Sequence, residues 1–467
     1  MKRLFINILL LSSGLTFAQQ SINTQYSTNA IELYGQDMNS GSAKYIGVGG
    51  AVGALGGDIS SVEQNPAGLG VAINSEVYIT PSVVNYKNTN TFYSQTVDKK
   101  TDLDFQQFAG TFVFNTNDDK WNRFTVGVNY LNQRLDKINK TAANPNIIFN
   151  NFDDNGNLVN KYTFNGYGDQ IEGYKSKLSV NLGTAYDNKL YLGLGLNFHE
   201  TNYQKFEQYA EKSSNGDNYV YNLDGYPLSE IGQGFSFSAG AIYKFNHNVR
   251  AGVAYHSPVW YNVEEQYYAA NYDDYGYATS YNLYGGTYDM TRGGRVVGSL
   301  GFVLDKNLSV GLDYTYHMND VTELKPSNSF VSNNNFISQF VNNSSEIRVG
   351  GEYRIDKLKA RLGYNYVQSP YKDINLSIAN VDNDLIATTL TKPFVGDINR
   401  YSLGLGYDFG GFFIDAAYQY QTQKANQLIG YGTYVDNDLY SVDLPDYYAP
   451  KVKLDRSMFL LTLGWQF

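Results

Sequence analysis

The chain has no cysteine, few charges for its length, and no long apolar run beyond its first eighteen residues. Of its 467 residues none is Cys and 17% are charged. Without cysteine no disulfide can stabilise the chain, so a large exported protein must rely on a packed core or a closed barrel. Without eighteen consecutive apolar residues no transmembrane helix is predicted. These absences exclude a disulfide scaffold and a helical membrane protein.

Basic residues are not in excess either, since 35 Lys and Arg stand against 45 Asp and Glu, for a net charge of −10. No basic stripe is available to neutralise phosphates, which argues against a nucleic-acid partner. Tyr (43) and Gly (45) are abundant, and 42% of the residues are apolar although the mean hydropathy is only −0.39. Apolar residues must therefore alternate with polar ones, which indicates strands.

The first residues have the pattern of a secretory signal peptide. Lys2 and Arg3 precede an apolar stretch from Leu4 to Phe17, and small residues stand at the −3 and −1 positions of a cut after Ala18. We therefore expect residues 1–18 to be removed and the mature chain to be exported.

Alternation of apolar and polar residues recurs along the whole chain. It is clearest at the end, where Phe459, Leu461, Leu463, Trp465 and Phe467 share one face of a predicted strand. Bacterial outer-membrane barrels carry a last strand of this kind, ending on Phe. The pattern predicts fourteen strands, at Val77–Tyr86, Phe105–Phe114, Phe124–Leu135, Leu178–Tyr186, Leu190–Phe198, Phe235–Phe245, Val249–Tyr255, Val296–Leu304, Leu308–Tyr316, Ile347–Ile355, Leu358–Tyr366, Tyr401–Phe409, Phe412–Tyr420 and Phe459–Phe467.

The connections between these strands alternate in length. Short turns such as 187–189, 246–248, 305–307 and 356–357 are interleaved with long segments near 138–173, 207–232, 262–293, 320–343, 372–398 and 425–452. This rhythm is typical of an all-β, fourteen-stranded antiparallel transmembrane barrel. Tyrosines at strand ends suit an aromatic girdle: Tyr130, Tyr186, Tyr255, Tyr316, Tyr366 and Tyr420. A soluble sandwich or propeller would leave the hairpin rhythm unexplained, and no blade repeat is visible.

The stretch GVGGAVGALGGD, residues 47–58, has the glycines of a phosphate-binding loop but not its setting. A dinucleotide loop lies between a buried strand and a helix, whereas GSAKYI is a poor strand and NPAG and the barrel follow. The segment instead resembles the N-terminal plug of FadL-type outer-membrane transporters. The matching residues are Gly41-Ser42-Ala43, Gly47, Gly49-Gly50-Ala51, Asp58 and Asn65-Pro66-Ala67-Gly68-Leu69. On this resemblance residues 19–75 form the plug and 76–467 the barrel.

The resemblance implies passive transport of hydrophobic compounds such as long-chain fatty acids. Substrate would enter between outer loops, bind an apolar pocket near the plug, and leave when the plug shifts or sideways through the wall. The residues expected to form the plug and gate are Gly47, Gly49, Gly50, Asp58, Asn65, Pro66, Ala67 and Gly68. Pro66 fixes a bend and Asn65 can satisfy nearby backbone groups. The alternative is that the plug is only a structural stopper.

Ligand contacts are predicted in a tyrosine-rich loop, because tyrosines offer rigid amphipathic surface. The candidates are Trp260, Tyr261, Tyr267 and Tyr268. The loop could equally face lipopolysaccharide without binding a ligand, and an outer-membrane barrel is expected to contact membrane lipid and lipopolysaccharide in any case.

His199, His256 and His317 occupy the polar side of three predicted strands and are expected to face the lumen. Imidazoles can bind haem iron or a metal. Successive outgoing strands are roughly 10 Å apart, which disfavours one ion shared by all three. We therefore predict no metal and no cofactor, and keep a haem receptor only as a minor alternative.

Inward charges gather on the later strands: Arg348, Glu352, Arg354, Lys359, Arg361, Asp408 and Asp415. They are expected to form ion pairs that fix plug and wall. No nucleophile elbow or metal motif is present, so no enzyme is predicted. The alternatives are a FadL-like barrel in protein secretion or surface attachment, with a protein partner, and an outer-membrane lipase or protease.

Overall fold

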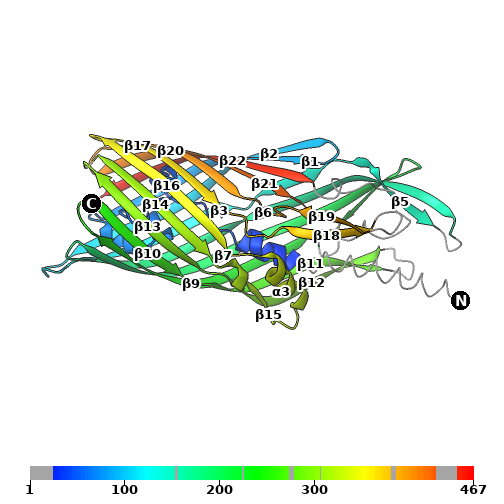
Figure 1. Cartoon of the computed structure of the whole chain (residues 1–467), viewed down its shortest axis with the longest axis horizontal. Helices are drawn as coiled ribbons and strands as arrows, with labels where there is room; N and C mark the ends of the chain where they lie inside the picture. Colours follow the sequence, from blue (N-terminus) through cyan, green and yellow to red (C-terminus); the bar gives the residue numbers. More distant parts are fainter. Residues whose placement is uncertain are drawn as a thin grey trace.

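The computed structural model describes residues 25–152, 156–222, 226–272, 278–305, 307–379, 385–427 and 450–467. These residues form one closed antiparallel barrel with the N-terminal segment inside it (Figure 1). Among them no helix is both long enough and apolar enough to cross a membrane.

Fourteen strand positions make up the wall. In chain order they are β1 (Glu76–Thr91), β2 (Gln95–Asn115), β3 (Trp121–Arg134), β6 (Leu158–Tyr186), β7 (Leu190–Ser213), β9 (Leu228–Lys244), β10 (Val249–His256) continued by β11 (Val259–Tyr272), β12 (Ala278–Arg292) continued by β13 (Arg295–Leu304), β14 (Leu308–His317), β16 (Ser344–Ile355), β17 (Leu358–Val367), β20 (Ile398–Asp408), β21 (Phe412–Asn426) and β22 (Lys451–Gln466). Each pairs with its neighbours, and β22 pairs with β1, which closes the ring.

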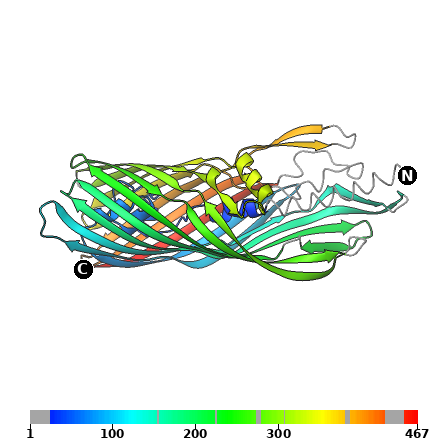
Figure 2. The same ribbon diagram turned by 90° about the horizontal axis from the view of Figure 1, so that it is seen from below.

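Smaller elements lie at the end of the barrel that carries the long connections. They are β4 (Lys137–Thr141), β5 (Asn144–Phe152), β8 (Asn218–Asn222), β15 (Glu323–Lys325), the turn η4 (Asn319–Val321), the helix α3 (Val331–Phe340) and the hairpin of β18 (Ile374–Ala379) and β19 (Leu385–Leu390). The hairpin projects beyond the barrel in Figure 2.

The strand alternation places apolar side chains outside and small or polar ones inside. On β7, Leu194 is 61% exposed on the outer face whereas Asn197 on the inner face is buried. The short turns have hairpin geometry, since Asp187 and Asn188 both have positive φ, 51° and 47°, as a two-residue turn between twisted strands requires. The predicted fourteen-stranded barrel with an apolar exterior is confirmed.

The prediction of long loops was wrong over much of their length. Wall strands continue well past the apolar band: β6 has 29 residues and β7 has 24, and β11 and β12 form a hairpin where residues 262–293 were expected to be a loop. Beyond the apolar band of β6 the buried inward side chains include charged Asp169 and Lys175 as well as Tyr167 and Ile171, so the regular apolar alternation that reveals a strand is missing.

One predicted girdle tyrosine also lies at the other edge of the barrel. Tyr186 pairs with Trp121 beside the short turns, whereas Tyr130, Tyr255, Tyr316, Tyr366 and Tyr420 lie towards the long connections.

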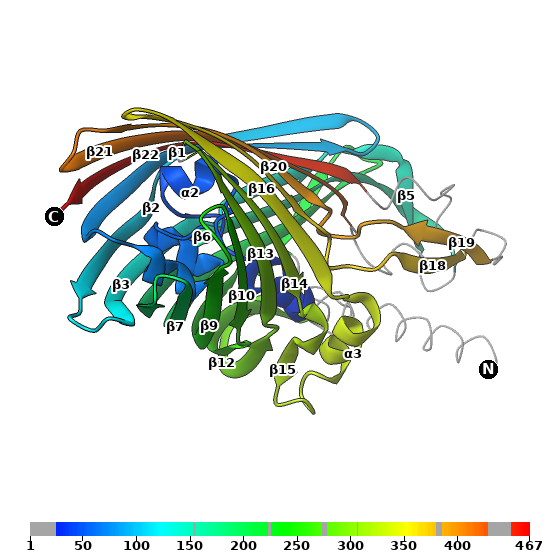
Figure 3. The ribbon, with the colours of Figure 1, turned by 60° about the vertical axis from the view of Figure 1, so that its left-hand side comes forward.

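The plug fills the lumen with short helical turns, seen inside the ring of strands in Figure 3. These are η1 (Ala30–Tyr34), α2 (Ala43–Gly47), η2 (Ile59–Glu63) and η3 (Pro66–Val71). Ten strands turn a glycine towards the plug. The plug backbone lies directly against seven of these glycines, Gly183, Gly193, Gly252, Gly311, Gly350, Gly363 and Gly404, and plug side chains lie against the other three, Gly127, Gly240 and Gly301. We call this set the glycine belt.

The glycine belt runs across neighbouring strands in paired rows. Gly301, Gly311, Gly350 and Gly363 are successive cross-strand partners, and Gly183, Gly193 and Gly240 form a second row. A Cβ atom on Gly193 would lie 2.2 Å from the carbonyl carbon of Pro66. No side chain fits there, so these positions set where the plug can lie.

We expect Gly193→Ala to destabilise the folded barrel by about 1–3 kcal/mol, the usual cost of overpacking. Gly298→Ala is the matched control, because a Cβ on this outward-facing glycine of β13 would meet nothing within 4 Å. Thermal unfolding, followed by the shift in gel migration between folded and heated protein, measures both. Equal stability of the two variants would contradict the role given to the belt.

Candidate functional site

The Asn65-Pro66 turn anchors the plug to the wall. Asn65 has an extended backbone and its side chain accepts a hydrogen bond from the Ala67 backbone N–H at 3.0 Å, which starts η3 with Pro66 in its first turn. Its amide nitrogen donates to the carbonyl oxygen of Ala241 on β9 at 3.2 Å. Asn65 and Ala67 are fully buried. The turn therefore combines a helix cap with a contact to the wall.

The remaining predicted plug residues shape the same compact body. Asp58 caps η2 through the Ser60 N–H at 2.7 Å and accepts hydroxyl hydrogen bonds from Ser42 and Tyr78, each at 2.8 Å. Gly49 and Gly50 have φ of +64° and +75°, a left-handed turn that favours glycine. Gly47 lies against Gly404, and a Cβ on Gly68 would collide with Ser61.

A polar chamber lies on both sides of the plug segment 36–38. Six cationic and four anionic side chains line it. The cations are Lys175, Lys177, Arg292, Arg295, Arg348 and Arg400, and the carboxylates are Asp37, Glu63, Glu200 and Glu346. We call it the cationic chamber. The resemblance had implied an apolar pocket beside the plug, and for the cavity nearest the plug this expectation was wrong.

Asp37 of the plug is the centre of one half of the chamber. It binds Arg292 of β12 and Arg295 of β13. Arg292 reaches Asp37 from the end of β12 and Arg295 reaches it from the start of β13, with Gly293 and Gly294 between the two strands. Burial opposes ionisation of Asp37, but the charges of Arg295 and Arg292 outweigh it and hold the pKa of this carboxyl well below its usual value.

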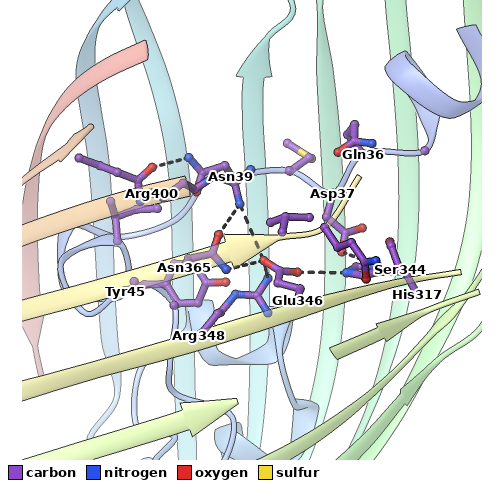
Figure 4. A pocket seen from close by; sticks show the side chains of 18 of the residues that line it. Gln36, Asp37, Asn39, Tyr45, His317, Ser344, Glu346, Arg348, Asn365 and Arg400 are labelled. Carbon is purple, nitrogen blue, oxygen red and sulfur yellow. Dashed lines mark hydrogen bonds and ion pairs between the residues drawn. The ribbon is translucent and has the colours of Figure 1, made fainter. Parts of the chain in front are cut away.

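Glu346 of β16 is the centre of the other half (Figure 4). It accepts hydrogen bonds from Arg348 at 2.6 Å, Asn365 at 2.7 Å and His317 at 3.1 Å, with Arg400 at 3.8 Å. Arg400 also donates to the Asn365 side-chain oxygen at 2.6 Å. Ligand atoms of Asp37, His317 and Glu346 lie within 4.8 Å of one another. Arginines already occupy these carboxylates, so the local charge suits an anion better than a metal ion.

The three predicted lumen histidines point inward but bind separate partners. His199 lies 2.8 Å from the Ser236 hydroxyl, His256 lies 3.2 Å from the Gln64 carbonyl oxygen, and His317 contacts Glu346. The structure thus does not gather them around one point.

The later-strand charges lie on the lumen side and form ion pairs. Arg361 lies between Glu352, at 2.7 Å, and Asp415, at 2.5 Å, and Lys359 lies 3.4 Å from Asp408. Arg354 is half-exposed at the short-turn end, 3.5 Å from Glu352. Arg348 also donates to Gln64 of the plug at 2.8 Å, so these charges connect plug and wall.

An aromatic and aliphatic cluster lies beyond the chamber, towards the long connections. Tyr34 of η1 is fully buried and packs edge-on against Tyr261 at 5.1 Å and Tyr203 at 6.3 Å between ring centroids. Its neighbours include Ile31, Val263, Tyr288, Met290, Leu324 and Ile337. The apolar surface that the resemblance implied is therefore present, but the chain's own η1 packs into it.

The four predicted ligand contacts divide between two faces of the wall. Tyr261 and Tyr267 face inward, and Tyr267 stacks on Tyr284 at 5.7 Å. Trp260 and Tyr268 are exposed on the outer face, where Trp260 stacks on Phe237. Only the first two can therefore contact a ligand in the lumen.

The wall loses its backbone pairing between β2 and β3 beside the plug. The β2–β3 ladder ends at Gln107 and Leu131, and beyond it Gln95–Phe105 pairs only with β1 while β4 pairs with β6. The Ser40 hydroxyl of the plug lies 2.8 Å from the carbonyl oxygens of both Gln106 and Asn132. Side chains alone bridge the strands above, including Asn132 to Asp104 at 2.9 Å.

A sequence profile of the family described as outer membrane protein transport protein (OMPP1/FadL/TodX) matches residues 21–441. The chain belongs to the OMPP1/FadL/TodX family. This makes it an outer-membrane β-barrel of a family that transports hydrophobic compounds. No curated protein matches the chain in sequence.

Solved OMPP1/FadL/TodX structures share the fold. A Pseudomonas aeruginosa FadL homologue is 15% identical with a TM-score of 0.56, over 93% of this chain and 100% of that one. The P. putida toluene transporter TodX is 12% identical with a TM-score of 0.54, over 92% and 99%. The Ralstonia pickettii toluene transporter TbuX is 12% identical with a TM-score of 0.51, over 92% and 99%.

Sequence reasoning missed most of the chamber of this OMPP1/FadL/TodX barrel. Asp37, Lys175, Arg292, Arg295 and Glu346 come from the plug and four strands, and nothing in their spacing shows that they meet. The glycine belt did leave a signal, because glycines recur on the inward side of consecutive predicted strands.

We expect Asp37→Asn to destabilise the protein by about 3 kcal/mol at neutral pH, because it leaves Arg292 and Arg295 without their carboxylate. The pKa of Asp37 is lowered in the folded state, so its contribution is complete above the unfolded value of about 3.9 and is lost as pH falls through the folded value. Urea unfolding between pH 8 and pH 3, with exposed Asp119→Asn as control, tests this. A difference between wild type and variant that grows on acidification would refute it.

Proposed function

We propose that this barrel is a passive channel for hydrophobic compounds with an anionic head group, such as long-chain fatty acids, that enter from the cell exterior. The observation that carries the proposal is the cationic chamber beside the aromatic cluster. In the half of the chamber beside Lys175 five cations face three carboxylates, and in the other half Arg348 and Arg400 face Asp37 and Glu346, so the chamber as a whole has a positive excess. A carboxylate head group would lie in the chamber, and its apolar tail would replace η1 against Tyr203, Tyr261 and Val263, which η1 now covers.

Arg400 is the cation best placed to bind such a head group. Its neighbours Asn365 and Gln421 are neutral, and its nearest carboxylate, Glu346, lies at 3.8 Å. The other chamber arginines each have a closer carboxylate, because Asp37 binds Arg292 and Arg295 and Glu346 binds Arg348. Binding an anion at Arg400 would therefore break no strong ion pair.

Release is proposed through the wall between β2 and β3. The glycine belt holds the plug against ten strands, at seven of them by its backbone, which opposes movement of the whole plug. Between Asp104 and Asn132 the strands are joined by side chains only. Side chains can separate at a smaller cost than a β-ladder, so an apolar molecule would pass sideways into the membrane.

The proposal includes export of the protein itself, for which residues 1–18 would serve as the signal peptide. No covalent step is involved, which is why we propose a channel and not an enzyme.

Arg400→Gln is expected to weaken binding of a long-chain fatty acid about 10- to 100-fold, the value of one charge-assisted hydrogen bond. Binding of the fatty acid methyl ester should change little. Equilibrium dialysis of each radiolabelled ligand in detergent measures both affinities, and Arg354→Gln at the short-turn end is the control. Equal affinity of wild type and Arg400→Gln for the acid would refute the head-group site, and a barrel used in protein secretion would bind neither ligand.

A disulfide across the proposed exit should stop uptake. The chain has no cysteine, so Asp104→Cys with Asn132→Cys gives a single cross-link between β2 and β3. Oxidation should abolish fatty acid uptake by proteoliposomes, and reduction should restore it. The control pair, Asn85→Cys with Thr101→Cys, joins β1 and β2 where they already pair. Uptake that persists in the oxidised first pair would favour exit past the plug instead.

A further inference from the structure

A group of lysines lies on the outer surface of the wall, above its lipid-facing band. The strands β21, β22, β1 and β2 lie side by side in the wall (Figure 1). Five lysines occupy outward positions on them: Lys424 of β21, Lys451 and Lys453 of β22, Lys87 of β1 and Lys99 of β2. We call them the lysine patch. The single carboxylate among these outward positions is Asp455, which Lys453 binds at 2.8 Å. The patch therefore carries a net charge of about +4 on a chain of net charge −10.

The strand register fixes the height of the patch. An apolar row of outward side chains crosses five strands and consists of Leu103, Val83, Phe459, Tyr418 and Leu403. The next outward row contains Tyr420 and Tyr401, and the one above it contains Lys99, Lys87 and Asp455. One row is two residues, about 7 Å along a strand and about 5 Å in height at the usual tilt. The lysines thus lie just above the interfacial tyrosines, at the level of lipid head groups.

Two lysine pairs in the patch are directly opposed across strands. Lys87 pairs with Lys99, and Lys424 pairs with Lys453. Like charges at directly opposed positions destabilise a sheet. Within the part of the chain that the structure describes, Lys87, Lys99, Lys424 and Lys451 have no carboxylate ion-pair partner. Asp98, which precedes Lys99 on β2, lies on the other face, as does Asp136, which binds Lys100.

Protection of a sheet edge explains only part of the patch. Lysines guard exposed edge strands, which accounts for Lys99, because this part of β2 pairs only with β1. Lys87 and Lys453 lie on strands that are paired on both sides. Bound anions would offset the repulsion, and at head-group height the anions at hand are the phosphates of lipids. Charges at this level also attract anionic lipid by roughly 1 kcal/mol per lysine or arginine.

We propose that the lysine patch binds the phosphorylated head group of a lipid in the outer leaflet, with the lipid's acyl chains against the apolar row of Val83, Phe459 and Tyr418. Each opposed lysine pair clamps a phosphate group from two neighbouring strands. This site lies outside the barrel and does not depend on the proposed transport.

The test titrates the full-length barrel in mild detergent with lipid A, a phosphorylated glycolipid, and counts bound lipid by native mass spectrometry. Substituting Lys87, Lys99, Lys424 and Lys453 together by Gln should weaken lipid A binding at least tenfold. Raised salt should weaken it in the wild type, because the sites are exposed. A zwitterionic phospholipid should bind wild type and variant equally.

The control variant removes the same charge at the other end of the barrel, with Gln at Lys120, Lys189, Lys244 and Lys357 beside the short turns. It should bind lipid A like the wild type. Gel migration of heated and unheated samples shows whether each variant is folded. Unchanged binding by the patch variant, or an equal loss in the control, would overturn the proposal. Displacement of lipid A by an equal concentration of inorganic phosphate would overturn it too, since the site would then bind the ion and not the lipid.

Discussion

Direct contact between plug backbone and wall backbone is the constraint on which the site depends. The plug can lie against the strands only because the glycine belt leaves no side chains between them, as at Gly193 against Pro66 and Gly363 against Gly49. This contact fixes the plug in height and rotation. Asp37, which follows η1, is thereby held where Arg292 and Arg295 meet. Without the belt the charges of the chamber would have no fixed partner.

Wall cations complete the attachment by binding the plug's backbone carbonyl oxygens. Arg123 donates to Gly70 at 3.1 Å, Arg250 to Leu55 at 3.0 Å and Lys175 to Gln36 at 2.6 Å. Buried carbonyl groups need such donors, since the backbone of an irregular segment does not pair them in secondary structure. The same lumen thus uses cations for two purposes: to hold the plug, and to leave a positive excess beside the aromatic cluster.

The sequence predicted the barrel well because membrane strands must alternate. Leu192, Leu194 and Leu196 could only be lipid-facing, and tight turns such as Asp187-Asn188 marked their ends. The pattern failed above the membrane, where the buried inward positions of β6 include charged Lys175 as well as apolar Ile171. The chamber could not be predicted, because Asp37, Arg292 and Glu346 are brought together by strand register, which local spacing does not reveal.

The closing seam between β1 and β22 has a consequence for how the protein is assembled. Glu76 and Gln466 meet across this seam although they are 390 residues apart in the chain. Such a distant pairing is slow to form, because the whole intervening chain must be ordered first. The plug immediately precedes β1, so the segment that the barrel encloses is joined directly to the strand that closes it. Closing the ring and filling it therefore both depend on where β1 lies.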